Sequence, residues 1–487
     1  MKQIAVVASV LVLVLACSPG TAWAQGHEAS VSKIVRLNRA PVNKAVLRVH
    51  LPRPAEQRLA NGLQVIVLER PKLPTIDFEL WIKTGALADP KELPGLAEFT
   101  ADMLHEGTAR RTSAQLAGDV DDIGATLSAS AAFGSSVSEV SASGFVEDAD
   151  RILELMSDTV LHPTFPADEL DKYRKRQLAD LEAERSSPSF LAREKLHQVI
   201  YREFPAAVVS ATPESVNRVT REDLQRFHDR YYMPDNALLG VAGDVTLNQV
   251  LPLIEKYFGG WQPHSVSQPP LGSLPLPSAF KITLVDRPGS VQTNILAGDY
   301  SLRRNDPNYI PLVVTNRILG GGPTGRLFID LREEKGYTYG AYSFFTSDIY
   351  PGVWLAETQV RNAVTDGSMH ELIAQFKRLR DEKTPEEELE EARRAIVASF
   401  ALSLEYPARL LDDWMTVSYY KLPASYWDAY PAQVAKVTAG TVQQMAEKYV
   451  DLNHLQFVCV GDGKQIASVL KKYGPVETYD VNGKRED

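Results

Sequence analysis

The chain has 487 residues, of which 44% are hydrophobic and 23% charged, and this composition excludes a disordered, collagen-like or mainly coiled-coil protein. The 52 Lys and Arg residues stand against 62 Asp and Glu residues, and the net charge of -10 argues against a nucleic-acid partner. Only two cysteines are present, Cys17 and Cys459, so a framework of several disulfides is excluded.

The amino terminus is predicted to be an export signal, residues 1–24. Its apolar run, Ile4 to Ala16, is too short to span a membrane. Ala22-Trp23-Ala24 fits the cleavage site of ordinary signal peptidase. Val14-Leu15-Ala16-Cys17 instead resembles a lipobox, so a lipid anchor at Cys17 is the alternative. A buried N-terminal helix is the structural alternative. Since no later segment is long and apolar enough for a transmembrane helix, we expect a periplasmic protein, soluble or lipid-anchored.

The remaining sequence is predicted to be a tandem repeat, because short matches recur in nearly one register. Leu68-Glu69-Arg70-Pro71 recurs as Val285-Asp286-Arg287-Pro288, 217 positions later. Pro166, Glu169, Leu170 and Arg174 recur as Pro385, Glu388, Leu389 and Arg393, 219 positions later, and Gly243-Asp244 recurs as Gly461-Asp462, 218 positions later. We therefore expect two similar domains, residues 45–262 and 280–482, joined by a linker rich in Pro, Ser and Gly at residues 263–279.

Each half mixes strand and helix patterns. The patterns predict strands at residues 63–67, 75–82 and 135–144, and helices at 94–105, 168–185 and 385–404. This combination predicts the α+β class, with two homologous domains that each have a largely antiparallel sheet covered by helices. Cys459 lies in an apolar, strand-like run, which favours a buried structural cysteine over a nucleophile.

The helix predicted at 94–105 carries the first functional pattern. The stretch Pro94 to Thr108 reads PGLAEFTADMLHEGT and resembles the zinc helix of the pitrilysin/insulinase family of metallopeptidases. In that family a His-x-x-Glu-His motif supplies two zinc ligands and a general base, and a glutamate on a later helix supplies the third ligand. The resemblance covers nearly the whole mature chain and implies a clam-shell half of a dimeric metallopeptidase.

This chain departs from the motif at each decisive position. Glu98 and Asp102 stand where the family has its histidines, Ala101 stands at the general base, and Asp180 stands at the third ligand. Carboxylates suit a hard cation better than zinc, and alanine cannot accept a proton from water. We therefore expect no metal in this chain, with Glu98 and Asp102 as solvated acids. A hydrolase that uses a metal bound by these carboxylates is the alternative.

The second half keeps a different pattern. Gly320, Gly321 and Gly322, followed by Arg326-Leu327-Phe328, resemble the glycine loop of the family's carboxy-terminal signature. The resemblance implies that this loop, Arg332 and Tyr339 bind substrate, with Arg332 and Tyr339 reaching the zinc site of the facing half and stabilising the oxyanion of the bound peptide. A guanidinium and a phenol are suitable donors for this task. The structural alternative is a surface arginine and a core tyrosine.

These patterns together predict a non-zinc subunit of a periplasmic heterodimeric zinc endopeptidase. Such a subunit is inactive alone and contributes substrate binding and oxyanion stabilisation to peptide hydrolysis. Its implied partner is a paralogous subunit that carries the His-x-x-Glu-His motif and holds the zinc. The alternative without catalysis is an inactive peptide-binding or scaffold protein of the cell envelope.

Overall fold

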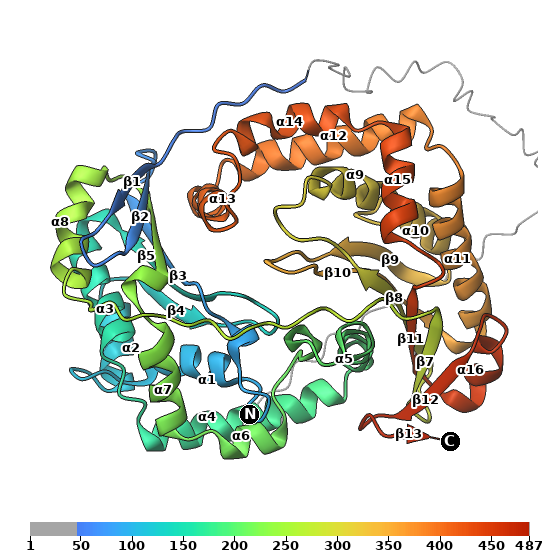
Figure 1. The fold of residues 1–487 in the computed structure, drawn as a ribbon, viewed down its shortest axis with the longest axis horizontal. Helices are drawn as coiled ribbons and strands as arrows, with labels where there is room; N and C mark the ends of the chain where they lie inside the picture. Colours follow the sequence, from blue (N-terminus) through green and yellow to red (C-terminus); the bar gives the residue numbers. More distant parts are fainter. Residues whose placement is uncertain (1–45, 487) are drawn as a thin grey trace, which may run out of the picture. The chain divides into compact units, whose positions relative to one another are not determined.

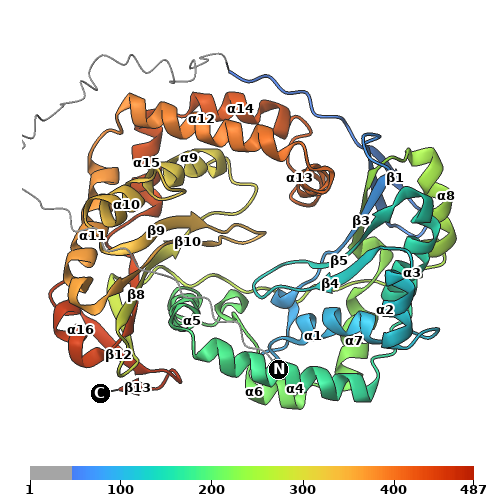
Figure 2. The same ribbon diagram turned by 180° about the vertical axis from the view of Figure 1, so that it is seen from behind.

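The computed structural model describes residues 46–486, so the predicted signal segment and Cys17 lie outside the described residues. Two mixed sheets with helices packed on them make up the described chain, as Figures 1 and 2 show from opposite sides. The predicted α+β class is therefore confirmed. No helix within residues 46–486 is long and apolar enough to cross a membrane.

The first sheet has six strands, and all neighbouring strands are antiparallel except the parallel pair β2 and β6. In spatial order its strands are β1 (Ala55–Arg58), β2 (Gln64–Glu69), β6 (Ala237–Gly243), β3 (Thr75–Ile82), β5 (Ser138–Phe145) and β4 (Thr126–Ser130). The helices of this half are α1 (Leu96–Met103), α2 (Ser113–Asp121), α3 (Ala149–Leu161), α4 (Ala167–Arg185), α5 (Pro188–Tyr201), α6 (Pro213–Arg218), α7 (Arg221–Tyr231) and α8 (Leu247–Phe258).

The second sheet has seven strands, with parallel pairs only where β7 meets β11 and β12. In spatial order its strands are β13 (Arg485–Glu486), β12 (Val476–Asp480), β7 (Lys281–Asp286), β11 (Gln456–Gly461), β8 (Gln292–Tyr300), β10 (Val353–Arg361) and β9 (Thr338–Phe345). The helices of this half are α9 (Tyr309–Leu319), α10 (Arg326–Phe328), the π-helical turn η7 (Ile329–Glu334), α11 (Thr365–Asp381), α12 (Glu386–Ser403), α13 (Pro407–Tyr419), α14 (Tyr426–Lys436), α15 (Ala439–Tyr449) and α16 (Gly463–Leu470).

The two sheets share one strand order over five strands. The order β2-β6-β3-β5-β4 in the first sheet matches β7-β11-β8-β10-β9 in the second. The side-chain contacts repeat as well, because the Arg174 guanidinium donates from Nη2 to the carbonyl of Val219 at 2.9 Å and its counterpart Arg393 donates from Nε to Val437, the counterpart of Val219, at 3.0 Å. Residues 262–279, between the halves, contain no helix or strand.

The elements predicted from the sequence are present with small shifts at their ends. The strand at 75–82 agrees with β3, whereas β5 begins at Ser138 because the chain turns at Ser135. The helix predicted at 94–105 begins after Gly95, whose φ of 94° suits glycine, and ends as a 3₁₀ turn, Leu104–Glu106. Cys459 is buried in β11, as predicted, and burial raises the pKa of its thiol to about 12.

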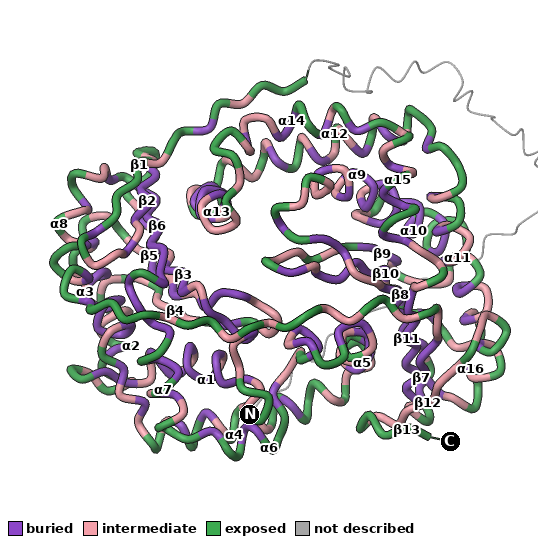
Figure 3. Tube along the Cα trace, viewed as in Figure 1, coloured by how far each residue is buried: buried purple, intermediate pink, exposed green. Residues whose placement is uncertain are grey.

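Each half contributes one helix to the sheet of the other half. Helix α5 packs on β8 and β11 of the second sheet, and its counterpart α13 packs on β2 and β6 of the first. The contacts are apolar and close: Leu196 joins a core cluster with Leu296 and Val458, and a Cβ on Gly240 would lie 2.5 Å from Met415 Sδ. Figure 3 shows that the central strands of both sheets are buried. Each sheet therefore depends on a helix from the other half for part of its cover.

Four carboxyl groups line a cavity of about 370 Å³ where α13 meets the first sheet. Asp77 and Glu79 come from β3, Glu139 from β5 and Asp412 from α13. Burial raises the pKa of Glu79 to about 8, and the charges of Glu139 and Asp412 add to this effect. The pKa of each other carboxyl is raised as well, chiefly by burial. Ionisation of this cluster therefore disfavours the contact between α13 and the sheet.

The stability of the protein is expected to fall as pH rises past the pKa of Glu79. The pKa of Glu79 in the folded protein, about 8, lies above the ordinary value of 4.5, so its stabilising contribution is complete below about 4.5 and is lost as pH rises from there through 8. Glu79→Gln removes this titration and should raise the melting temperature at pH 9 by a few degrees. Thermal unfolding at pH 6 and pH 9 measures the effect, with Glu56→Gln on the exposed strand β1 as control. A loss of stability with pH that is the same in wild type and Glu79→Gln would contradict the assignment.

Candidate functional site

Helix α1 carries three positions of the degenerate motif, Glu98, Ala101 and Asp102. The hydrophobic core of the first half lies on one side of these positions, and Tyr173 of helix α4 contacts Asp102 on the other. Ala101 is fully buried and belongs to the hydrophobic core of this half. Glu98 and Asp102, four residues apart, share a face adjacent to that of Ala101 and are both partly buried. The general-base position of the motif is thus occupied by a core methyl group, which no water can use as a proton acceptor.

The expectation that Glu98 and Asp102 are solvated acids is wrong. Burial, together with the charges of Asp102, Glu184 and Asp89, raises the pKa of Glu98 to about 8. Burial also raises the pKa of Asp102, against the opposing effect of a hydrogen bond from Tyr173. At neutral pH Glu98 is therefore mainly a neutral carboxylic acid. The cause is partial burial, to which Tyr173 of α4 contributes by bonding Asp102 and packing against Phe99.

Helix α4 meets Asp102 through Tyr173 and Gln177 rather than through a third carboxylate. The Tyr173 hydroxyl donates to Asp102, and Gln177 Nε2 donates to the Tyr173 oxygen at 2.8 Å. The ring of Tyr173 packs edge-on against Phe99 of α1 with centroids 4.8 Å apart. Asp180 lies further along α4 and is exposed. Tyr173 and Gln177 are the residues that sequence reasoning missed, since no pattern on α4 marks which turn faces α1.

These residues do not fit a zinc ion. A zinc site needs at least three ligands at bonding distance, and here Asp102 already accepts a hydrogen bond from Tyr173, while Asp180 is exposed further along α4. Within residues 46–486, no group of three or more His, Cys, Asp or Glu side chains is placed so that it could hold a metal ion.

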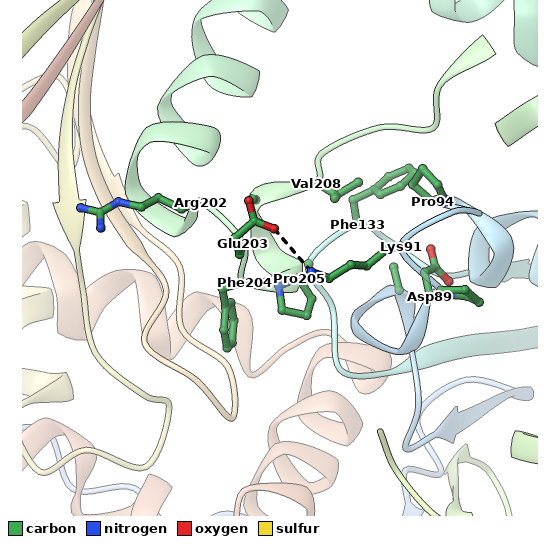
Figure 4. Close-up of a pocket in the computed structure, with 13 residues that line it drawn as sticks. Asp89, Lys91, Pro94, Phe133, Arg202, Glu203, Phe204, Pro205 and Val208 are labelled. Atoms are coloured by element: carbon green, nitrogen blue, oxygen red, sulfur yellow. Dashed lines mark hydrogen bonds and ion pairs between the residues drawn. The ribbon is translucent and has the colours of Figure 1, made fainter. Parts of the chain in front are cut away.

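A cavity of about 160 Å³ lies beside the amino-terminal end of α1 (Figure 4). Asp89 at its wall accepts backbone hydrogen bonds from Gly95 at 2.7 Å and Ala97 at 2.8 Å, and so satisfies the first N–H groups of the helix. Lys91 and Glu203 form an exposed ion pair, 3.4 Å between Nζ and Oε2, that Figure 4 marks with a dashed line. Asp89 is therefore engaged in holding the helix.

The second half presents Arg332 and Tyr339 at the edge of its sheet. Tyr339 is on β9, the edge strand, and is 91% exposed. Arg332 is on η7, which packs against β9, and its guanidinium lies over the ring of Phe328, 4.8 Å from the centroid. The nearest carboxylate, Glu333, lies 3.4 Å from Nε and is itself exposed. The alternative of a core tyrosine is thus wrong, and both donors are available to a molecule outside the chain.

The glycine loop owes its composition to close packing. The Gly320 carbonyl accepts a hydrogen bond from the Ser343 amide of β9 at 2.9 Å, and a Cβ at Gly320 would lie 2.6 Å from that nitrogen. A Cβ at Gly321 would lie 2.9 Å from the Cα of Arg317, and one at Gly322 would lie 2.2 Å from Arg317 Nη1. The loop therefore anchors β9, which carries Tyr339, and this packing alone explains the glycines.

Gly320→Ala is expected to destabilise the protein by roughly 1–3 kcal/mol, because the added methyl group meets backbone atoms of β9 that cannot move aside cheaply. Gly322→Ala should cost less, since its methyl group meets the end of the flexible Arg317 side chain. Urea unfolding of both variants measures the difference. Equal stability of Gly320→Ala and wild type would show that β9 is not held by this loop.

Comparisons with known proteins agree with this fold and these motifs. The family model described as insulinase (peptidase family M16) matches residues 64–214, and the model described as peptidase M16 inactive domain matches residues 218–396. An uncharacterized zinc protease of Bacillus subtilis, YmxG, is 24% identical over 353 residues, which cover 71% of this chain and 83% of that protein. An uncharacterized zinc protease of Mycobacterium leprae is 26% identical over 325 residues, covering 66% of this chain and 69% of that protein.

Solved structures show the same architecture. A crystal structure titled peptidase M16 inactive domain, from Pseudomonas fluorescens, superposes with a TM-score of 0.78 and 25% identity, covering 84% of this chain and 97% of that chain. A protease from Helicobacter pylori also gives a TM-score of 0.78, at 19% identity, covering 84% of this chain and 100% of that chain. The fold and the motif positions define a metallopeptidase-type chain. The chain belongs to the M16, or insulinase, family of peptidases.

Proposed function

We propose that this chain is the non-zinc subunit of a periplasmic heterodimeric zinc endopeptidase and contributes substrate binding and oxyanion stabilisation. The partner is an M16 subunit that carries the His-x-x-Glu-His motif and holds the zinc. The observation that supports the proposal most strongly is an asymmetry between the halves. At α1 the acids are partly buried and the base position is a core methyl group, whereas Arg332 on η7 and Tyr339 on β9 face solvent.

The chemistry of the donor pair supports the same division of labour. A tetrahedral intermediate of peptide hydrolysis carries negative charge on an oxygen, and a phenol and a guanidinium can donate hydrogen bonds to it. Tyr339 projects from a strand whose backbone is anchored by the glycine loop, so its hydroxyl can be held in place without being buried. Gly320, Gly321 and Gly322 serve substrate binding in this proposal by fixing that strand.

The alternative of a carboxylate-metal hydrolase finds no support in this geometry. Its proposed ligands are Glu98, Asp102 and Asp180, but Glu98 has a pKa of about 8 and Asp180 is exposed on α4. A cation site also needs several ligands placed together, and within residues 46–486 no group of three or more His, Cys, Asp or Glu side chains is so placed. The scaffold alternative differs from the proposal only in catalysis, and the assay below separates the two.

The purified chain alone is expected to contain no stoichiometric zinc and to leave unstructured peptides uncleaved, because it lacks both the ligands and the base. The chain co-expressed with an M16 paralogue from the same genome that carries the His-x-x-Glu-His motif should form a complex with one zinc and with chelator-sensitive peptidase activity. Elemental analysis and a peptide cleavage assay measure both. Near-equimolar zinc with cleavage by the chain alone would overturn the proposal. A stable complex without any gain over the paralogue alone would favour the scaffold.

A further inference from the structure

The second half contains a cavity of about 540 Å³ between α9 and α12, which we call the α9–α12 cavity. Helices α13 and α14 and strand β9 complete its walls. Its size lies within the usual range for sites that bind small molecules or single side chains of a peptide. It is distinct from the Arg332 and Tyr339 pair, neither of which lines it.

The repeat explains why the cavity exists. Helices α9 and α12 are the counterparts of α1 and α4, between which Phe99 packs against Tyr173. At the same offsets of 217 and 219 positions the second half has Asn316 and Ala392, which are much smaller than the two rings. The space that two aromatic side chains fill in the first half is therefore not filled in the same way in the second.

The walls of the α9–α12 cavity are largely aromatic. Phe400 and Trp427 stack with centroids 5.7 Å apart and an interplanar angle of 17°, and Tyr309 meets Phe345 edge-on at 5.6 Å. Tyr430 completes this set. Rigid aromatic walls of this kind favour a flat apolar group and add little conformational entropy cost on binding.

One guanidinium in the wall has no carboxylate partner. Arg317 donates from Nη1 to the Gly321 carbonyl at 2.6 Å, while its Nε is buried without a hydrogen-bond acceptor. Among the ion pairs of residues 46–486 none involves Arg317. An unpaired donor of this kind costs free energy until an acceptor reaches it.

The other charges around the cavity leave it positive. Arg409 in the wall is paired, with Nη2 3.1 Å from Asp413 and Nη1 3.3 Å from Asp412. Arg304 lies behind the wall, buried, with its guanidinium 4.1 Å from the Tyr309 ring centroid. Arg317 and Arg409 are the charged residues that line the cavity, and Arg317 has no carboxylate partner among the described residues, so an anion is favoured over a cation.

We propose that the α9–α12 cavity binds an organic carboxylate with an aromatic or aliphatic body, such as the carboxyl-terminal residue of a peptide. Arg317 receives the carboxylate, and the rings of Tyr309, Phe400 and Trp427 receive the body. A single unpaired guanidinium matches one negative charge, whereas a phosphate dianion would need more donors than these walls offer. The site needs neither zinc nor a partner subunit, so its fate is independent of the proposed peptidase role.

Calorimetric titration of the full mature chain tests the proposal with two matched pairs of probes. The first pair is N-acetyl-phenylalanine and its carboxamide, and the second is acetyl-Ala-Ala-Phe with a free or an amidated carboxyl terminus. Each free acid should bind at least about tenfold more tightly than its amide, because the amide loses the charge-assisted hydrogen bonds to Arg317. Tighter binding of the tripeptide acid than of N-acetyl-phenylalanine identifies a peptide terminus, and equal binding identifies a small carboxylate. Equal affinity for acid and amide, or no binding of either acid, would overturn the proposal.

Three variants locate the site. Arg317→Gln should abolish the preference for the acid, and Ser399→Trp should block binding, because Ser399 is an exposed residue of α12 that lines the cavity. Ala398→Trp is the matched control, since Ala398 is an exposed neighbour that does not line the cavity. This variant should bind the probes as tightly as the wild type. If Arg317→Gln does not fold, the comparison of the two tryptophan variants remains decisive. Unchanged binding by Ser399→Trp would place the ligand elsewhere and overturn the assignment.

Discussion

Replacing Tyr339 by phenylalanine is expected to lower the peptidase activity of the reconstituted heterodimer by about 100- to 1000-fold in kcat, the usual effect of removing one oxyanion donor. The change deletes one hydroxyl from a side chain that is 91% exposed in this chain, so folding and subunit assembly should be unaffected. If the hydrogen bond forms only in the transition state, KM should change little. Steady-state assays of the assembled complex, with assembly checked by size-exclusion chromatography, measure the effect.

Two further variants make this experiment specific. Arg332→Lys keeps the positive charge but loses the planar fork of donors, so it should also reduce kcat. Tyr342→Phe is the control, because Tyr342 lies on the same strand but packs against Phe328 with centroids 5.5 Å apart. Full activity of both Tyr339→Phe and Arg332→Lys in an intact complex would rule out oxyanion stabilisation by this chain and leave the scaffold role.

Replacing Arg326 by methionine is expected to destabilise the chain by roughly 2–4 kcal/mol, because it breaks a largely buried ion pair and leaves a carboxylate behind. Arg326 has a side chain only 5% exposed and forms two parallel hydrogen bonds to Glu388, 2.7 Å from Nε to Oε1 and 2.8 Å from Nη2 to Oε2. The pair joins α10, directly after the glycine loop, to α12. Urea unfolding of the purified chain measures the loss.

The repeat supplies a matched control for this pair. Glu169 is the counterpart of Glu388 in the first half, but its partner is Lys172, whose side chain is 58% exposed and whose Nζ lies 2.8 Å from Oε1. Lys172→Met should therefore change the free energy of unfolding far less than Arg326→Met does. If the two variants lose the same stability, burial of the Arg326 pair does not set its strength.

The sequence predicted on which helix the site residues lie better than it predicted how far they are buried. The motif placed Glu98, Ala101 and Asp102 on one helix, and α1 confirms that placement. It could not predict the full effect on the pKa of Glu98, because beside Asp102 on the same helix the charges that raise this pKa come from Glu184 on α4 and from Asp89. Burial of this kind depends on contacts between distant segments, whereas spacing along one helix is a local property.

The third ligand position shows a second limit. Counting along α4 led to Asp180, but the side chains that reach Asp102 and its phenol partner are Tyr173 and Gln177, one to two turns earlier. Register between two helices depends on the conformation of every connection between them, and a single sequence does not determine that conformation. The same limit applies to Arg326, whose partner Glu388 lies 62 positions away.

Helices α5 and α13 each pack on the sheet of the other half, and this packing affects how the chain could be cut into fragments. A fragment ending near residue 262 would keep the first sheet but lose α13, and would expose the apolar surface around Leu238 and Ala242 to water. A fragment beginning near residue 280 would likewise lose α5, which covers Leu296 and Val458. Separately produced halves should therefore aggregate or pair with a second copy through domain swapping, whereas co-produced halves should reassemble by fragment complementation. Although the repeat looks like two modules in sequence, folding couples them into one cooperative unit.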